Sequence, residues 1–187
     1  MIDGLVRYSR VSGDFPWGVA AHPYPENLMD ARTWEDTEPT NAFDTPKITP
    51  RNIEVLDRYM HQPALLYRGE RVRTVLLSEQ GFHTPPDYSQ AALDDQASAI
   101  AYTWEKILPL ASIETYHYHR WLDNAGEGGF LPGLRTLPTP EEPAGRRKQP
   151  GFDLFSALET ERHTEAVRPH LERIGIPDPV AHSAPER

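Results

Sequence analysis

The sequence predicts an α/β fold with parallel strands, because three short apolar segments each precede a stretch of helical character. β-Branched and aromatic residues are frequent in segments 17–21, 71–78 and 113–119, which we expect to be strands. Alternating strands and helices imply parallel strands joined by right-handed crossovers. Such folds bind ligands beyond the carboxyl ends of their strands, so we expect the functional site there.

The first predicted unit begins with strand 17–21, which ends in the turn His22-Pro23-Tyr24-Pro25. The polar loop 26–47 follows, and loops of this length in a compact domain are usually functional. Thr49 is suited to cap the next helix, because it precedes Pro50 at the favoured first helical position. Three residues give this helix its apolar stripe: Ile53, Leu56 and Met60.

The second predicted unit delivers a single acid at a strand end. Strand 71–78 leads directly to Glu79, and loop 81–88 with His83 follows. The end of a buried parallel strand is rigid and faces the ligand-binding edge, so a carboxylate there is well placed for catalysis. The next helix has Ser89 as its expected N-cap and the strongest apolar periodicity of the chain: Leu93, Ala97, Ile100, Trp104 and Ile107.

The third predicted unit is strand 113–119, the Gly- and Pro-rich loop 120–150, and one helix over 152–174. Three parallel strands are few for a sheet covered on both faces, and they leave two open edges. We therefore expect the C-terminal part of a larger barrel. The expected division of the chain is a lead-in, the partial barrel and a frayed tail: 1–14, 15–175 and 176–187.

Composition narrows the function classes. A net charge of −9 argues against nucleic acid and against an anionic membrane as partners. The absence of cysteine excludes disulfides, thiolate metal sites and cysteine nucleophiles. No stretch has the length and apolarity of a membrane span, no signal peptide is visible, and the compartment stays open. Two charged clusters are expected to be solvated: Arg146-Arg147-Lys148, and Glu35, Asp36 and Glu38.

The order of motifs resembles the last three βα units, six to eight, of the (β/α)8 TIM-barrel glycoside hydrolases of retaining clan A. The matching phrases are His22-Pro23-Tyr24, then Leu77-Ser78-Glu79-Gln80-Gly81-Phe82, then Tyr116 to Asp123. The chain is also similar to uncharacterised bacterial glycosidase-like domains that share the Ser-Glu-Gln-Gly-Phe and His-Tyr-His-Arg-Trp phrases. The resemblance spans about 15–175 and implies a carbohydrate substrate, with no metal and no cofactor.

The resemblance implies that Glu79 is the nucleophile of a retaining reaction. It implies sugar contacts for six side chains, with the indole stacked on a pyranose ring: His22, Tyr24, His83, His117, His119 and Trp121. Retaining chemistry also needs a second carboxyl about 5 Å away that protonates the leaving oxygen. Clan A enzymes carry it in a strand-end Asn-Glu pair, which this chain lacks. We therefore expect the chain to be inactive alone and to need the N-terminal part of the barrel.

Alternative interpretations remain open at this point. The chain fits a carbohydrate-binding or assembly domain that lacks complete catalysis. It also fits a metal-dependent hydrolase, because His117 and His119 alternate along a strand and Asp123 offers an oxygen ligand. Glu79 fits a purely structural hydrogen-bond network as well, and Trp121 fits the core.

Overall fold

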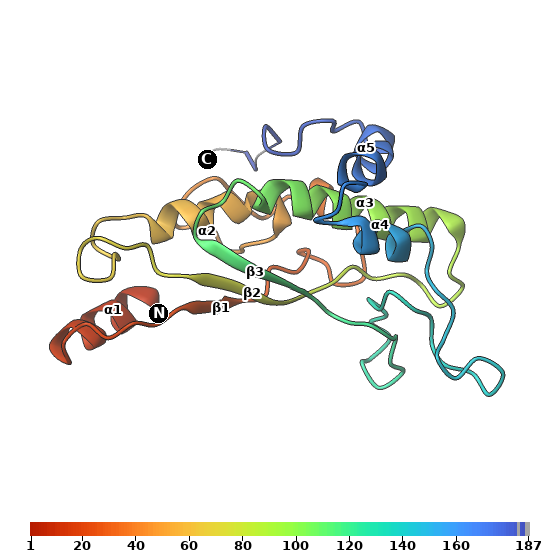
Figure 1. The fold of residues 1–187 in the computed structure, drawn as a ribbon, viewed down its shortest axis with the longest axis horizontal. Helices are drawn as coiled ribbons and strands as arrows, with labels where there is room; N and C mark the ends of the chain where they lie inside the picture. Colours follow the sequence, from red (N-terminus) through yellow and green to blue (C-terminus); the bar gives the residue numbers. More distant parts are fainter. Residues whose placement is uncertain (183, 186–187) are drawn as a thin grey trace.

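The computed structural model describes residues 1–182, 184 and 185, and a three-stranded parallel sheet lies at its centre (Figure 1). Strands β1 (Val19–Ala21), β2 (Val75–Gln80) and β3 (Ile113–Tyr118) are neighbours in chain order. The predicted α/β class with parallel strands is confirmed. The first two strands begin later than expected, and β2 extends through Glu79 itself.

Helices cover one face of this sheet. Figure 1 shows α2 (Ile53–Met60), α3 (Gln90–Ile107), α4 (Gly151–Ala157) and α5 (His163–Arg173) on the same side. Apart from Leu93, the apolar stripes predicted for α2 and α3 lie in two core clusters, together with strand residues such as Val75 and Leu77.

The opposite face of the sheet carries no comparable helical layer in the described part of the chain. Side chains alternate along a strand, so the neighbours of core residues point away from the helices. Ala20 and His117 are such neighbours, and both are exposed. A parallel sheet is normally covered on both faces, so this sheet retains a surface that further structure can cover.

The start of α2 is capped as the sequence predicts. The short 3₁₀ helix η2 (Pro50–Asn52) leads into α2, and the Thr49 hydroxyl accepts a hydrogen bond from Arg51 N at 3.2 Å. In return, Thr49 N donates to Asn52 Oδ1 at 2.9 Å. Thr49 is buried, so water cannot replace its hydroxyl when that group is removed.

Replacing Thr49 with alanine is expected to lower the free energy of unfolding by about 1–2 kcal/mol, because one backbone N–H then loses its partner. Urea denaturation followed by circular dichroism measures this change. The Thr49→Ser variant keeps the hydroxyl and serves as the control, which should retain most of the stability. Equal losses in both variants would assign the effect to the lost methyl group instead.

The expectation of a single helix over 152–174 is wrong, since the chain forms α4 and α5 with a break between them. Leu158 has extended backbone (ψ 144°), and Glu159 has a left-handed backbone with φ 58°. The Thr160 hydroxyl donates to Ala157 O at 2.7 Å, a local bond that competes with helix continuation. The break turns α5 back so that it packs on α3 as well as α4.

The terminal segments are more ordered than expected. Residues 1–14, taken as a lead-in, contain the helix α1 (Ile2–Val11). In the expected tail, His182 Nδ1 lies 3.0 Å from the Tyr102 hydroxyl, and Lys106 Nζ donates to His182 O at 3.0 Å. Buried polar groups on α3 require such partners, so the expectation of fraying is wrong for the described tail. Positions 183, 186 and 187 lie outside the described residues.

The acidic loop before α2 is only partly solvated. Glu35 and Glu38 are exposed as expected, whereas Asp36 is buried and accepts a hydrogen bond from the Thr33 hydroxyl at 2.9 Å. Burial raises the pKa of Asp36 to about 6. The expectation of solvation is therefore wrong for Asp36, because the 3₁₀ helix η1 (Thr33–Glu35) turns it inward. Across the described residues, no helix combines the length and apolarity that crossing a membrane requires.

Candidate functional site

The central feature of the strand ends is a hydrogen bond between Glu79 and Tyr24. The Tyr24 hydroxyl donates to Glu79 Oε1 at 2.8 Å, and both side chains are half-buried. Burial, the bond to Glu79, and the charges of Glu79 and Glu127 all raise the pKa of Tyr24 above its ordinary value. The phenol therefore stays protonated at neutral pH and acts as a donor to the carboxylate.

An irregularity in the strand pairing redirects the backbone at Glu79. The interval from Leu77 to Gln80 on β2 is paired with the shorter interval from Tyr116 to Tyr118 on β3, so β2 carries one extra residue. Such a bulge bends the strand and re-aims a side chain, and bulges are frequent next to active sites. Gln80 is buried and its amide donates to His117 O at 2.5 Å, which holds the bulge against β3.

The turn after β1 brings two predicted residues to this edge. Tyr24 N donates to His22 O at 2.9 Å, while Pro23 and Pro25 are buried and restrict the turn. The exposed His22 ring lies with Nε2 3.1 Å from Ser78 Oγ. His22 thus directly follows β1, and its ring contacts Ser78, the residue before Glu79.

The end of β3 brings a third predicted residue to the same edge. His119 N donates to Gln80 O at 2.6 Å, and His119 Nε2 lies 3.4 Å from Glu127 Oε2. Arg120, joined to His119 by a cis peptide bond, forms an ion pair with Glu127 Oε1. His117 points to the same face but is exposed, and no hydrogen bond of its ring is found among the described residues.

Glu127 and Arg120 were not predicted as site residues. Glu127 lies in a Gly-rich turn that resembles a solvated loop in sequence. The available signal is that Glu127 is the only carboxylate in 124–133, within the loop that follows β3. The proximity of Glu127 to His119 depends on the path of the loop, which the sequence does not reveal.

Phe130 joins the turn that carries Glu127 to the other site residues. Its ring meets Tyr24 edge-on at 5.6 Å between centroids and stacks on His83 at 6.1 Å. His83 is buried, and its Nδ1 accepts a hydrogen bond from Leu131 N at 3.0 Å. Burial, and secondarily the charge of Lys148, lower the pKa of His83, so its ring is neutral near pH 7.

Trp121 lies apart from this group. Its side chain is 60% exposed, so the alternative that it belongs to the core is wrong. The indole packs against Phe152 of α4 at 5.3 Å and lies 5.9 Å from the Arg135 guanidinium. These contacts are on the helix side, and no contact with Glu79 or Tyr24 is found among the described residues.

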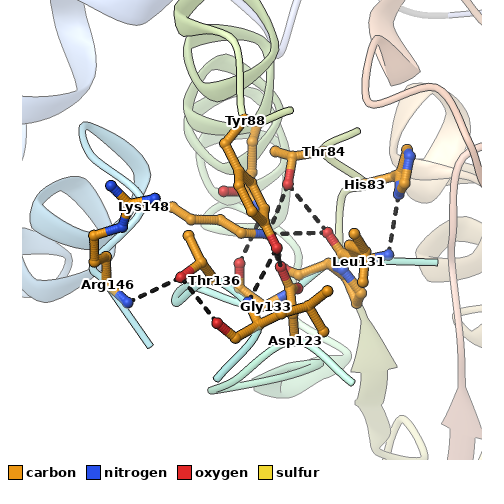
Figure 2. A network of polar contacts seen from close by, with 12 residues as sticks. His83, Thr84, Tyr88, Asp123, Leu131, Gly133, Thr136, Arg146 and Lys148 are labelled. Atoms are coloured by element: carbon orange, nitrogen blue, oxygen red, sulfur yellow. Dashed lines mark hydrogen bonds and ion pairs between the residues drawn. The ribbon is translucent and has the colours of Figure 1, made fainter. Parts of the chain in front are cut away.

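A buried ion pair holds the long loop after β3 in place (Figure 2). Lys148 Nζ lies 2.7 Å from Asp123 Oδ2, and both side chains are fully buried. Asp123 also accepts hydrogen bonds from Gly133 N at 2.7 Å and from the Tyr88 hydroxyl at 3.0 Å. The expectation that Lys148 is solvated is therefore wrong, while its neighbours Arg146 and Arg147 are exposed as expected.

The same lysine links two loops. Lys148 Nζ donates to Thr84 Oγ1 at 2.6 Å and to Leu131 O at 3.0 Å, which ties loop 81–88 to loop 120–150 (Figure 2). Burial lowers the pKa of Lys148 to about 8, and the charge of Asp123 opposes this shift. The network anchors both ends of the turn between Asp123 and Leu131, so it fixes the position of Glu127 beside His119.

The chain matches one family model over nearly its whole length. Residues 1–181 match the model of a family described as "Family of unknown function (DUF5722)". The chain belongs to this family. No curated protein and no solved structure matches it significantly. Any function of this DUF5722 protein must therefore be inferred from its own residues.

A metal centre finds little support in this DUF5722 chain. No group of three His, Asp or Glu side chains that could hold a metal ion is found in the described residues. His117 and His119 lack a third ligand, and the carboxylate of Asp123 is already bonded to Lys148, Tyr88 and Gly133. The side chains that do meet form two pairs: Glu79 with its donor Tyr24, and His119 with Glu127.

Proposed function

We propose that this DUF5722 protein is a glycoside hydrolase-like domain that supplies the last three βα units of a (β/α)8 barrel. Glu79 is its nucleophile, and carbohydrate is its substrate. The observation that carries the proposal is the position of Glu79 at the end of the central strand, with the Tyr24 hydroxyl 2.8 Å away. A hydrogen-bond donor favours the ionised carboxylate, which is the form that attacks an anomeric carbon.

The uncovered face of the sheet supports the barrel. In a (β/α)8 barrel the helices lie outside and the other face of each strand is turned inward. Here α2 to α5 occupy one face (Figure 1), and the exposed residues Ala20 and His117 alternate with core residues of their strands. The N-terminal units of a barrel are the proposed partner for the uncovered face. They would also complete the walls of the sugar site.

Trapping with activated 2-deoxy-2-fluoro glycosides tests the nucleophile. Their fluoride or dinitrophenolate leaving groups depart without protonation, so trapping does not need a second carboxyl. In the full-length protein, a panel of gluco, galacto, manno and xylo reagents should yield one adduct per chain for at least one sugar. Peptide mass spectrometry should place the adduct on Glu79.

The matched controls are Glu79→Gln and Glu114→Gln. Glu114 is an exposed carboxylate on β3, so its replacement should leave trapping unchanged. Glu79→Gln should abolish the adduct. An adduct on another residue, or no adduct with any reagent, would refute the assignment of Glu79.

A non-catalytic carbohydrate-binding role is the second candidate. It is favoured by the lack of a strand-end Asn-Glu pair and by the engagement of Glu127 with Arg120. This role predicts that glycan binding, measured by calorimetry, persists in Glu79→Gln and that no reagent of the panel forms an adduct.

A further inference from the structure

We propose that His119, oriented by Glu127, donates and accepts the proton in the reaction at Glu79. This inference rests on the function proposed above. It assigns within this chain the proton-transfer role for which the sequence offers no strand-end carboxyl.

The pairing of β2 and β3 brings the backbones of Glu79 and His119 to the same end of the sheet. His119 N donates to Gln80 O, so the backbones next to the two side chains are in contact. Gln80 and Tyr118 point into the buried side of the sheet. Side chains alternate along β3, so His119 points to the other side. Glu79 lies in the bulge just before Gln80, and its carboxylate is held by Tyr24 at the same end of the sheet.

A second path of contacts leads from Glu79 to the partner of His119. Tyr24 donates to Glu79 and packs its ring against Phe130. Phe130 N donates to Glu127 O at 3.1 Å, so Phe130 and Glu127 close one turn. The negative charges of both Glu79 and Glu127 raise the pKa of Tyr24, which agrees with two carboxylates near this phenol.

The histidine and its carboxylate have the arrangement of a base and its orienting group. Glu127 Oε1 is held by Arg120, while Oε2 lies 3.4 Å from His119 Nε2 without hydrogen-bond geometry to any described residue. Catalytic hydrogen bonds are often long before substrate binds and tighten afterwards. A carboxylate beside imidazole orients the ring and stabilises its protonated form.

The other ring nitrogen is available for the reaction. His119 Nδ1 has no hydrogen-bond partner in the described residues, and the side chain is 28% exposed. Substrate can therefore reach a ring whose opposite nitrogen faces a fixed carboxylate.

The proposed reaction has two balanced steps. In the first, Glu79 forms a bond to the anomeric carbon while the bond to the leaving oxygen breaks, and protonated His119 gives that oxygen its proton. In the second, water attacks the anomeric carbon and gives a proton to neutral His119, and the bond to Glu79 breaks. The products are a free sugar and an alcohol, and the enzyme returns to its initial state.

The test uses two substrates of the sugar that traps Glu79. One is the activated 2-fluoro glycoside, and the other is an alkyl glycoside, whose leaving alcohol needs a proton. His119→Ala should lose about 100-fold or more in kcat/KM on the alkyl glycoside, which needs a proton donor. The same variant should form the 2-fluoro adduct on Glu79 within about threefold of the wild-type rate, because the activated leaving group needs no proton. His119→Gln is the second variant, and His61→Ala, on the end of α2, is the remote histidine control with unchanged rates. Thermal unfolding verifies that each variant is folded.

Glu127→Gln supplies a readout that a structural role would not move. The variant should lose kcat/KM on the alkyl glycoside and keep the wild-type rate of adduct formation on Glu79, because only the step that needs a proton depends on the orientation of His119. Equal losses by His119→Ala and His119→Gln on both classes of leaving group, or full activity on the alkyl glycoside, would overturn the inference. Failure of the wild type to form an adduct on Glu79 would instead reject the proposed function, and this inference with it.

Discussion

Replacing Lys148 with methionine is expected to lower the free energy of unfolding by about 3–5 kcal/mol, because it leaves a buried carboxylate without its ionic partner. The Asp123 side chain is fully buried and would keep only Tyr88 and Gly133 as donors. Guanidinium denaturation measures the loss. The affected loop carries Phe130, which packs against the Tyr24 ring, so trapping at Glu79 should also be slower in the folded variant.

A double-mutant cycle separates the ion pair from the loss of packing. Asp123→Asn/Lys148→Met replaces the pair by neutral groups of similar size, and it should cost less than the sum of the two single changes. Arg146→Met, at an exposed position two residues away, should change stability by no more than about 0.5 kcal/mol. Additive single and double changes would show that the two charges do not stabilise each other.

The pH dependence of this effect has a defined sign. Burial lowers the pKa of folded Lys148 to about 8, whereas the ordinary value is 10.5. Between these values the unfolded chain binds more protons than the folded chain, so the contribution of Lys148 to stability rises with pH. The stability of the wild type relative to Lys148→Met should therefore increase from about pH 8 to about pH 10.5. A constant or falling difference would contradict the lowered pKa.

Gly81→Ala is expected to destabilise the protein by about 3 kcal/mol or more, because overpacking here meets backbone that cannot move freely. A Cβ at Gly81 would lie 2.0 Å from His119 O and 2.9 Å from Pro132 Cβ. Relief requires β2 and β3 to separate where Gln80 and His119 are bonded. Thermal unfolding should show the loss, and trapping at Glu79 should fall with it.

Gly4→Ala is the matched control for this substitution. A Cβ at Gly4 meets no atom within 4 Å, and the residue lies inside α1, where alanine favours helix formation. The control should be as stable as the wild type or more stable. Equal stability of the two alanine variants would show that the contact at Gly81 relaxes without cost.

The sequence predicted the parts of this protein that depend on local patterns. Short apolar runs with β-branched and aromatic residues identified the three strands, and the spacing from Leu93 to Ile107 identified α3. Glu79 was recognised for the same reason, since it follows an apolar strand directly. The break at Leu158 was missed, because a single threonine hydroxyl and one left-handed residue outweighed a helical pattern.

The tertiary structure alone decided which charges are buried and which side chains meet. Lys148 looks like a loop cation in sequence, yet Asp123 and Thr84, 25 and 64 positions away, surround it. Glu127 reaches His119 only because that network fixes the loop between them. Burial of a charge depends on partners that are distant in sequence, and no periodicity records them. Local pattern therefore determined the strands and Glu79, while packing decided the residues around it.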